Sequence, residues 1–210
     1  MVYKYLYDNN KKAILKCREC IQLINKKFNL FNVSTYSLKE EELSCVNIIG
    51  TILCCNSYTK ESNIVFNNLI NKLEFTYFND NFHFLKEKEF VIRIYLSVLN
   101  NLANSYYEMG EEYLDETIEL IRKGINISRK YTTYYRLANF YELKFKVEYR
   151  RKNIYESKKL YNQLLILYGM VGLEKFKERI VSKVEKDYII KKRLVVNDIK
   201  PFTTNLQLNI

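Results

Sequence analysis

Apolar residues recur along most of the chain at steps of three and four, the spacing of amphipathic helices. Two segments, 99–110 and 134–141, also share one order of packing positions. The large, small and aromatic positions are Leu102, Ala103 and Tyr106 in the first segment and Leu137, Ala138 and Tyr141 in the second. The two alanines lie about 35 residues apart, close to the period of tetratricopeptide (TPR) repeats. The pattern therefore predicts repeated helices.

Each of these helices is followed by a second amphipathic segment, which makes a helical hairpin. The second segments are 116–125 and 155–167, an earlier hairpin spans 43–57 and 61–73, 10–26 resembles a second helix alone, and 172–191 a capping helix. Small residues such as Gly124 are expected to let neighbouring helices approach closely. We predict an all-α fold, a TPR-like helical-hairpin solenoid that forms a right-handed α–α superhelix over residues 1–191. An irregular tail is predicted over 192–210.

Composition supports long helices in a soluble protein. The chain has one proline and five glycines, too few for an architecture rich in tight turns. No run of about 18 uncharged apolar residues occurs, and the N-terminus lacks the order of a secretory signal. We therefore expect a cytoplasmic protein without membrane contact, whose five cysteines stay reduced in apolar or helical contexts.

The formal net charge of +10 comes from small clusters of lysine and arginine spread along the chain. Such a surface could attract nucleic acid or an acidic partner without specificity. A solvated helical surface explains the same charge more simply. No DNA-reading element follows from the charge, so we expect no direct nucleic-acid contact from this chain.

The order of hairpins, the Asn-Leu-Ala-Asn-x-Tyr-Tyr core at 101–107 and the stretch from Tyr135 to Gly169 resemble the C-terminal half of Rgg/MutR-like and PlcR-like (RNPP-type) transcriptional regulators. The resemblance is clearest over residues 40–190. It implies a TPR-like domain that binds a short signalling peptide, as in quorum sensing, and that forms a homodimer. In those regulators a helix-turn-helix domain precedes the sensor, whereas no segment before Asn10 is long enough to fold as one.

The first helices of a TPR stack line its concave groove, so their polar residues are the candidates for peptide binding. Asn104 and Asn139 share one repeat position, and each amide offers one acceptor and two donors to a peptide backbone. Arg136 and Arg93 could hold a carboxylate through charge-assisted hydrogen bonds. Within about one helical turn lie the remaining candidates Asn100, Asn101, Tyr107 and Tyr135. Alternatively, these asparagines only bond to partners between helices.

Residues for catalysis or for a cofactor do not form a recognisable motif. The single histidine, His83, has no neighbouring nucleophile or carboxylate in a catalytic arrangement. The cysteines of Cys17-Arg-Glu-Cys20 fall within a predicted helix, whereas redox-active pairs place the first cysteine at a helix N-terminus. No second Cys pair or His pair completes a metal site, and no phosphate-binding loop occurs. We expect a protein that is not an enzyme and has no metal or cofactor.

Three functional hypotheses remain after these exclusions. The first is a peptide-binding sensor domain of a cytoplasmic transcriptional regulator, with the ligand in the concave groove. The second is a constitutive TPR scaffold for protein–protein interaction that binds a protein segment through its convex face or its tail. Direct DNA binding through the basic surface is a third and weaker hypothesis.

Overall fold

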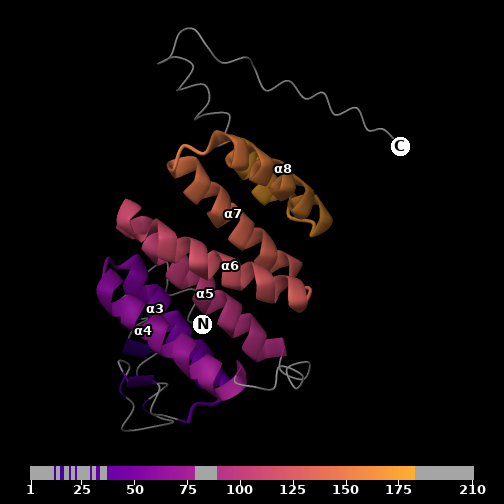
Figure 1. Cartoon of the computed structure of the whole chain (residues 1–210). Helices are drawn as coiled ribbons and strands as arrows, with labels where there is room; N and C mark the ends of the chain where they lie inside the picture. Colours follow the sequence, from indigo (N-terminus) through magenta and orange to yellow (C-terminus); the bar gives the residue numbers. More distant parts are fainter. Residues whose placement is uncertain are drawn as a thin grey trace. The chain divides into compact units, whose positions relative to one another are not determined.

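The computed structural model describes residues 37–78 and 89–182, together with residues 12, 15, 16, 19, 22, 29, 32 and 33. Helices joined by short turns dominate these residues, and no strand occurs among them, which confirms the all-α prediction there. The helices are α3 (Glu40–Cys55), α4 (Thr59–Leu73), the π-helix η2 (Glu74–Phe78), α5 (Glu89–Met109), the 3₁₀ helix η4 (Glu111–Tyr113), α6 (Leu114–Lys130), α7 (Tyr134–Arg150) and α8 (Ile154–Met170) (Figure 1).

The observed helices correspond to the predicted hairpins. Helices α3 and α4 form the predicted hairpin of 43–57 and 61–73, and α6 to α8 each contain the segment predicted for them. Helix α5 begins at Glu89, well before the predicted start at residue 99. The added turns are buried on several sides, at Val91, Ile92, Ile94, Tyr95, Leu96 and Val98, so they lack a clear polar face.

Successive helices from α3 to α7 pack against one another, and α5 also packs against α3 and α7. Helix α5 contacts α4 before it and α6 after it, and it also contacts α3 and α7. Leu99, Leu102 and Ala103, the packing positions at its centre, are almost completely buried. As a result, α3, α5 and α7 form a row of neighbouring helices within the part of the chain that the structure describes. We call α3, α5 and α7 the first helices and α4, α6 and α8 the second helices.

Four of the turns that follow described helices share a hydrogen-bond pattern that ends the helix with one residue in the left-handed conformation. These residues are Ser57 (φ 66°), Thr132 (φ 53°), Lys152 (φ 60°) and Gly172 (φ 69°). The amide of the following residue donates to a carbonyl five residues earlier, as in Tyr58 to Leu53 (3.0 Å) and Thr133 to Ser128 (2.9 Å). Three of the four turns therefore form without glycine, at a cost of about 1 kcal/mol each.

Glycine is instead used where helices cross closely. A Cβ atom at Gly50 of α3 would lie 2.5 Å from Cε1 of Phe66 in α4. A Cβ atom at Gly124 of α6 would likewise overlap the ring of Phe140 in α7. Both rings are completely buried. The prediction that small residues let neighbouring helices approach is confirmed at these two positions.

The chain divides into two compact units, residues 1–163 and 164–210, with the boundary inside α8. In the second unit, residues 174–182 are helical, within the predicted capping helix, and the rings of Tyr168 and Phe176 contact each other.

Some of the predictions concern residues outside the described part of the chain, namely the tail at 192–210, His83, Cys17 and Cys20. Of the predicted helix 10–26, only residues 12, 15, 16, 19 and 22 are described, and all five are helical. No described helix is both long enough and apolar enough to span a lipid bilayer.

Candidate functional site

Polar side chains connect the first helices α3 and α5. Asn101 Nδ2 donates to Asn47 Oδ1 (3.1 Å) and to Thr51 Oγ1 (3.0 Å), and Asn47 Nδ2 donates to Ser97 Oγ (3.3 Å). All four residues are half-buried. Asn101, one of the predicted peptide-binding residues, is therefore engaged between helices, which is the alternative that the sequence left open.

The side-chain amides of Asn100 and Asn104, also on α5, do not bond to another helix among the described residues. Asn104 Nδ2 donates to the carbonyl of Asn100 one turn earlier (2.7 Å), a bond within the helix. The Oδ1 atom of Asn100 is buried, and no donor among the described residues reaches it. A buried acceptor without a partner costs about 1–3 kcal/mol. Asn100 Oδ1 is therefore a buried acceptor that the described residues leave without a hydrogen bond.

The predicted residues of α7 lie on one face near the start of that helix. Tyr135 is exposed, Arg136 and Asn139 are half-buried, and the Arg136 guanidinium carbon lies 5.7 Å from the centre of the Tyr135 ring. Tyr107, near the end of α5, has the guanidinium of Arg150 stacked 3.6 Å from its ring centre. That guanidinium also donates to the Tyr107 carbonyl, which ties the C-terminal ends of α5 and α7 together.

The structure thus brings Asn100, Asn101, Asn104 and Tyr107 together on α5, and Tyr135, Arg136 and Asn139 together on the adjacent helix α7. Arg93 lies two turns or more before these α5 residues, where it is exposed and paired with Glu89 (2.5 Å). That these predicted residues of α5 and α7 contact a peptide stays a prediction.

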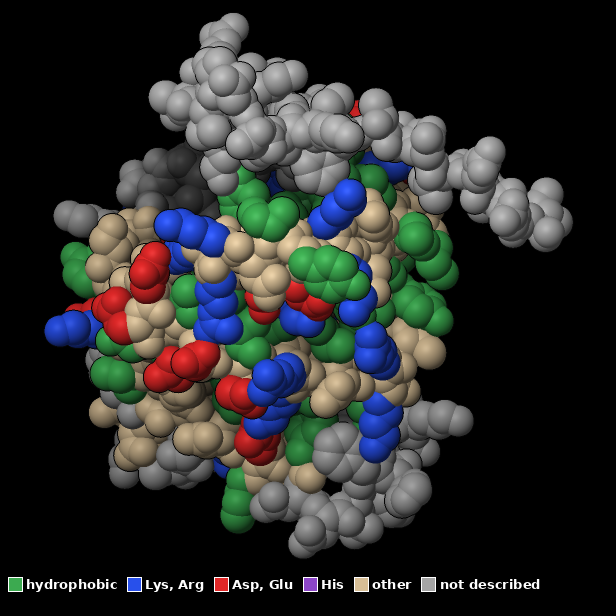
Figure 2. Space-filling view, turned by 45° about the horizontal axis from the view of Figure 1, so that its top comes forward, with side chains coloured by type: hydrophobic (Ala, Val, Ile, Leu, Met, Phe, Trp, Pro, Cys, Tyr) green, Lys and Arg blue, Asp and Glu red, His purple; other side chains and the backbone are tan. Residues whose placement is uncertain are grey.

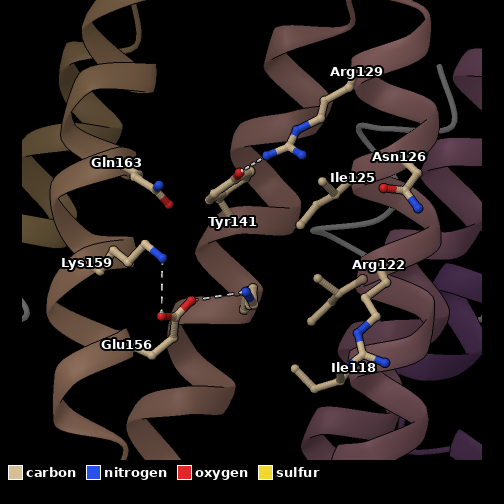
Figure 3. Close-up of a pocket in the computed structure, with 11 residues that line it drawn as sticks. Ile118, Arg122, Ile125, Asn126, Arg129, Tyr141, Glu156, Lys159 and Gln163 are labelled. Carbon is tan, nitrogen blue, oxygen red and sulfur yellow. Dashed lines mark hydrogen bonds and ion pairs between the residues drawn. The ribbon is translucent and has the colours of Figure 1, made fainter.

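A pocket of about 420 Å³ lies elsewhere, on the side of the second helices α6 and α8. We call it the α6–α8 pocket. It is lined by Ile118, Ile121, Arg122, Ile125, Asn126 and Arg129 of α6, Tyr141 and Lys144 of α7, and Glu156, Lys159 and Gln163 of α8. Figure 3 shows the labelled side chains of α6 and α8 on opposite sides of α7. None of the residues predicted for peptide binding lines this pocket.

Positive charge prevails in the α6–α8 pocket. Four cationic side chains line it but only one carboxylate, that of Glu156. Glu156 pairs with Lys144 (3.3 Å) and with Lys159 (3.8 Å), as the dashed lines in Figure 3 indicate. Arg122 pairs with Glu119, which is exposed. Arg129 donates to Tyr141 Oη (2.5 Å) and has no carboxylate partner among the described residues.

Charges of both signs occur on the face of the molecule seen in Figure 2. On the face shown in Figure 2, Lys and Arg side chains are interspersed with Asp and Glu, and hydrophobic side chains lie between them. On this face, neighbouring charges of opposite sign partly offset one another. Charge complementarity therefore has to be sought at individual positions, such as the α6–α8 pocket.

Sequence patterns did not indicate this pocket because its lining comes from three helices whose contact depends on the tertiary fold. One signal was present: Arg122 and Arg129 lie two helical turns apart, on the same stripe of α6 as Ile118 and Ile125. Cations that border an apolar stripe are common on solvated helices, so the spacing alone would not identify a site.

Metal binding and reactive-thiol chemistry have little support in the described residues. No group of three or more His, Cys, Asp or Glu residues there could hold a metal ion. Burial, with a smaller effect of Cys54, raises the pKa of the Cys55 thiol, which disfavours a reactive thiolate. Comparison with protein-family models, with curated proteins and with solved structures finds no match for this chain.

Proposed function

We propose that this chain is the peptide-binding regulatory domain of a transcriptional regulator, built as a right-handed solenoid of TPR-like hairpins. The repeats are α3 with α4, α5 with α6, and α7 with α8. The observation that supports this most is the contact between the first helices α5 and α7, because it places Asn100 and Asn104 on the helix next to the one that carries Asn139.

These amides suit an extended peptide backbone. A peptide has alternating N–H and C=O groups, and an asparagine amide can bond to both kinds. Arg136, on the same face of α7, can take a peptide carboxylate in a bidentate hydrogen bond. The ligand on this proposal is a short, largely hydrophobic signalling peptide.

Peptide binding regulates by shifting the balance between two arrangements of the hairpins, which changes the effector that the domain controls. The effector on this proposal is a helix-turn-helix domain that contacts DNA in a cytoplasmic homodimer. The resemblance of the 101–107 and 135–169 segments to RNPP-type regulators supports this assignment.

The test begins with selection of short peptides from a displayed random library on the purified chain, followed by calorimetry. Asn104→Ala and Asn139→Ala should each weaken a selected peptide by about fivefold or more, the loss of one hydrogen bond worth about 1 kcal/mol. Asn162→Ala, an exposed amide on α8, is the matched control and should bind like the unmodified chain. An unchanged affinity in the double variant Asn104→Ala, Asn139→Ala contradicts the proposal.

A constitutive scaffold is the second candidate, and the α6–α8 pocket favours it because this pocket lies on the side of the second helices, away from the predicted peptide groove. A scaffold needs no small ligand. Thermal shift distinguishes the two, since a peptide that binds only the folded chain must raise the melting temperature with its concentration. A scaffold predicts no peptide whose effect on the melting temperature is lost in the double variant Asn104→Ala, Asn139→Ala.

A further inference from the structure

The α6–α8 pocket has the shape of a trough along the helices. Its α6 lining runs from Ile118 to Arg129, which is about 17 Å along a helix, and its α8 lining runs from Glu156 to Gln163, about 10 Å. Ile118, Ile121 and Ile125 supply apolar lining on the α6 side, while the cations lie on both α6 and α8 (Figure 3). A trough that is two to three turns long favours an elongated ligand over a compact one.

The two arginines set the spacing that such a ligand must match. Arg122 and Arg129 are seven residues apart, so they lie about 10 Å apart along α6 and on the same side. A compact anion such as phosphate cannot contact both. A partner helix that lies along α6 with carboxylates at positions i and i+7 has the same 10 Å spacing. An aliphatic residue at i+4 then lies between the carboxylates, next to Ile125.

The cations that line the α6–α8 pocket are only partly neutralised by carboxylates of the described residues, which favours a carboxylate ligand. Arg129 is held by Tyr141, whose ring centre lies 5.9 Å from the guanidinium carbon, and it lacks an acidic partner in the described part of the chain. Lys144 and Lys159 share the single carboxylate of Glu156. An added carboxylate near Arg129 or Lys159 would therefore meet positive charge that the chain itself does not neutralise.

We propose that the α6–α8 pocket binds an acidic amphipathic helix of a partner protein, with two carboxylates two turns apart against Arg122 and Arg129 and an aliphatic side chain between them. This is the helix-in-groove mode of recognition. The pocket shares helix α7 with the proposed peptide site, but none of its lining residues is one of the residues proposed to bind the peptide. Either proposal can fail without the other.

The probe is a fluorescent alanine-based helical peptide with Glu at i and i+7 and Leu at i+4, titrated with the full chain by anisotropy. Replacing both Glu residues by Gln, or moving the second Glu to i+5 on another face of the helix, should weaken binding about tenfold or more. Equal binding of the three peptides, or no binding of the first, overturns the proposal.

Variants of the chain locate the site. Arg122→Gln and Arg129→Gln should each weaken the Glu peptide about tenfold, and Tyr141→Phe, which keeps the Arg129 charge, should weaken it less. Lys130→Gln removes the same charge from the residue next to Arg129, outside the pocket lining, and should change affinity less than twofold, as expected for an exposed charge. Circular dichroism melting confirms that each variant is folded. The proposal fails if Lys130→Gln weakens binding as much as Arg129→Gln.

Two competitors separate the ligand classes. Inorganic phosphate and an oligothymidine should displace the Glu peptide only through ionic strength, as sodium chloride does at the same ionic strength. Displacement by either competitor well beyond that of sodium chloride, lost in the Arg129→Gln variant, would identify the pocket as a phosphate or nucleic-acid site instead.

Discussion

The ring of Phe140 in α7 lies directly beside the α-carbon of Gly124 in α6, and a Cβ atom at position 124 would overlap three of the ring atoms. The contact is buried, since Gly124 is buried and Phe140 is completely inaccessible to solvent. The close crossing of α6 and α7 therefore depends on the missing side chain. A similar contact joins Gly50 of α3 to Phe66 of α4, there within one hairpin.

Gly124→Ala should lower the free energy of unfolding by about 1–3 kcal/mol, because the ring and backbone must move to admit a methyl group. Urea denaturation followed by circular dichroism measures this change. Gly169 is the control: it is helical with nothing within 4 Å of a Cβ, so Gly169→Ala should be neutral or stabilise by about 0.5–1 kcal/mol. A Gly124→Ala protein as stable as the Gly169→Ala protein would show that the crossing is loose.

Thr132→Gly should stabilise the chain by about 0.5 kcal/mol or more, because a β-branched residue is strained at φ 53° and glycine is not. Thermal and urea unfolding report the gain. The paired test is Gly172→Ala at φ 69°, which should destabilise for the same reason. If Thr132→Gly instead destabilises, the helix-ending conformation assigned to this turn is wrong.

Tyr95 of α5 gives the chain a specific sensitivity to alkaline pH. Its hydroxyl donates to Glu74 Oε1 (2.6 Å), and Lys123 pairs with the same oxygen. Burial, the hydrogen bond to Glu74 and the charge of Glu74, in that order, raise the pKa of Tyr95 well above its ordinary value. Above about pH 10 the unfolded chain loses this proton while the folded chain keeps it, so folding stability falls as pH rises.

The measurement compares the unmodified chain with Tyr95→Phe across alkaline pH. Below about pH 10 the Tyr95 proton is bound in both states and adds no pH dependence, whereas above it the difference in stability between the two proteins should change by about 1.4 kcal/mol per pH unit. Other tyrosines titrate in both proteins and cancel. Parallel stability curves on both sides of that pH would mean that Tyr95 ionises as it does in the unfolded chain.

Asn101→Ala should lower the free energy of unfolding by about 1 kcal/mol, because the amide is the donor shared by Asn47 and Thr51 of α3. Asn104→Ala removes only a bond to a carbonyl of its own helix and should change stability by about 0.5 kcal/mol or less. Urea denaturation ranks the two variants. The reverse order would assign the structural role to Asn104 and leave Asn101 for a ligand.

Much of the fold was predictable because the helices are amphipathic. The recurring Leu-Ala and aromatic positions identified α5 and α7, and small residues such as Gly124 marked the close crossings. The start of α5 was missed because residues from Val91 to Val98 are buried on several sides, which removes the periodic polar face that defines a helix in a sequence.

The sites were harder to predict, since they depend on which side chains the fold brings together. Asn101 bonds to residues more than a hairpin away in the sequence, and no local pattern indicates that pairing. The α6–α8 pocket combines Arg129 with Lys159 only after three helices have packed. The spacing of residues on one helix indicated candidate site residues. The partners of each candidate could be identified only from the tertiary structure.

The proposal that a peptide lies along the first helices is tested most directly by nuclear magnetic resonance of the asparagine side-chain amides. A library-selected peptide is titrated into chain labelled with ¹⁵N, with the signals assigned from the Asn104→Ala and Asn139→Ala variants. The Asn104 and Asn139 side-chain signals should shift together and saturate at the calorimetric affinity. The account is contradicted if both signals stay unmoved while the selected peptide binds.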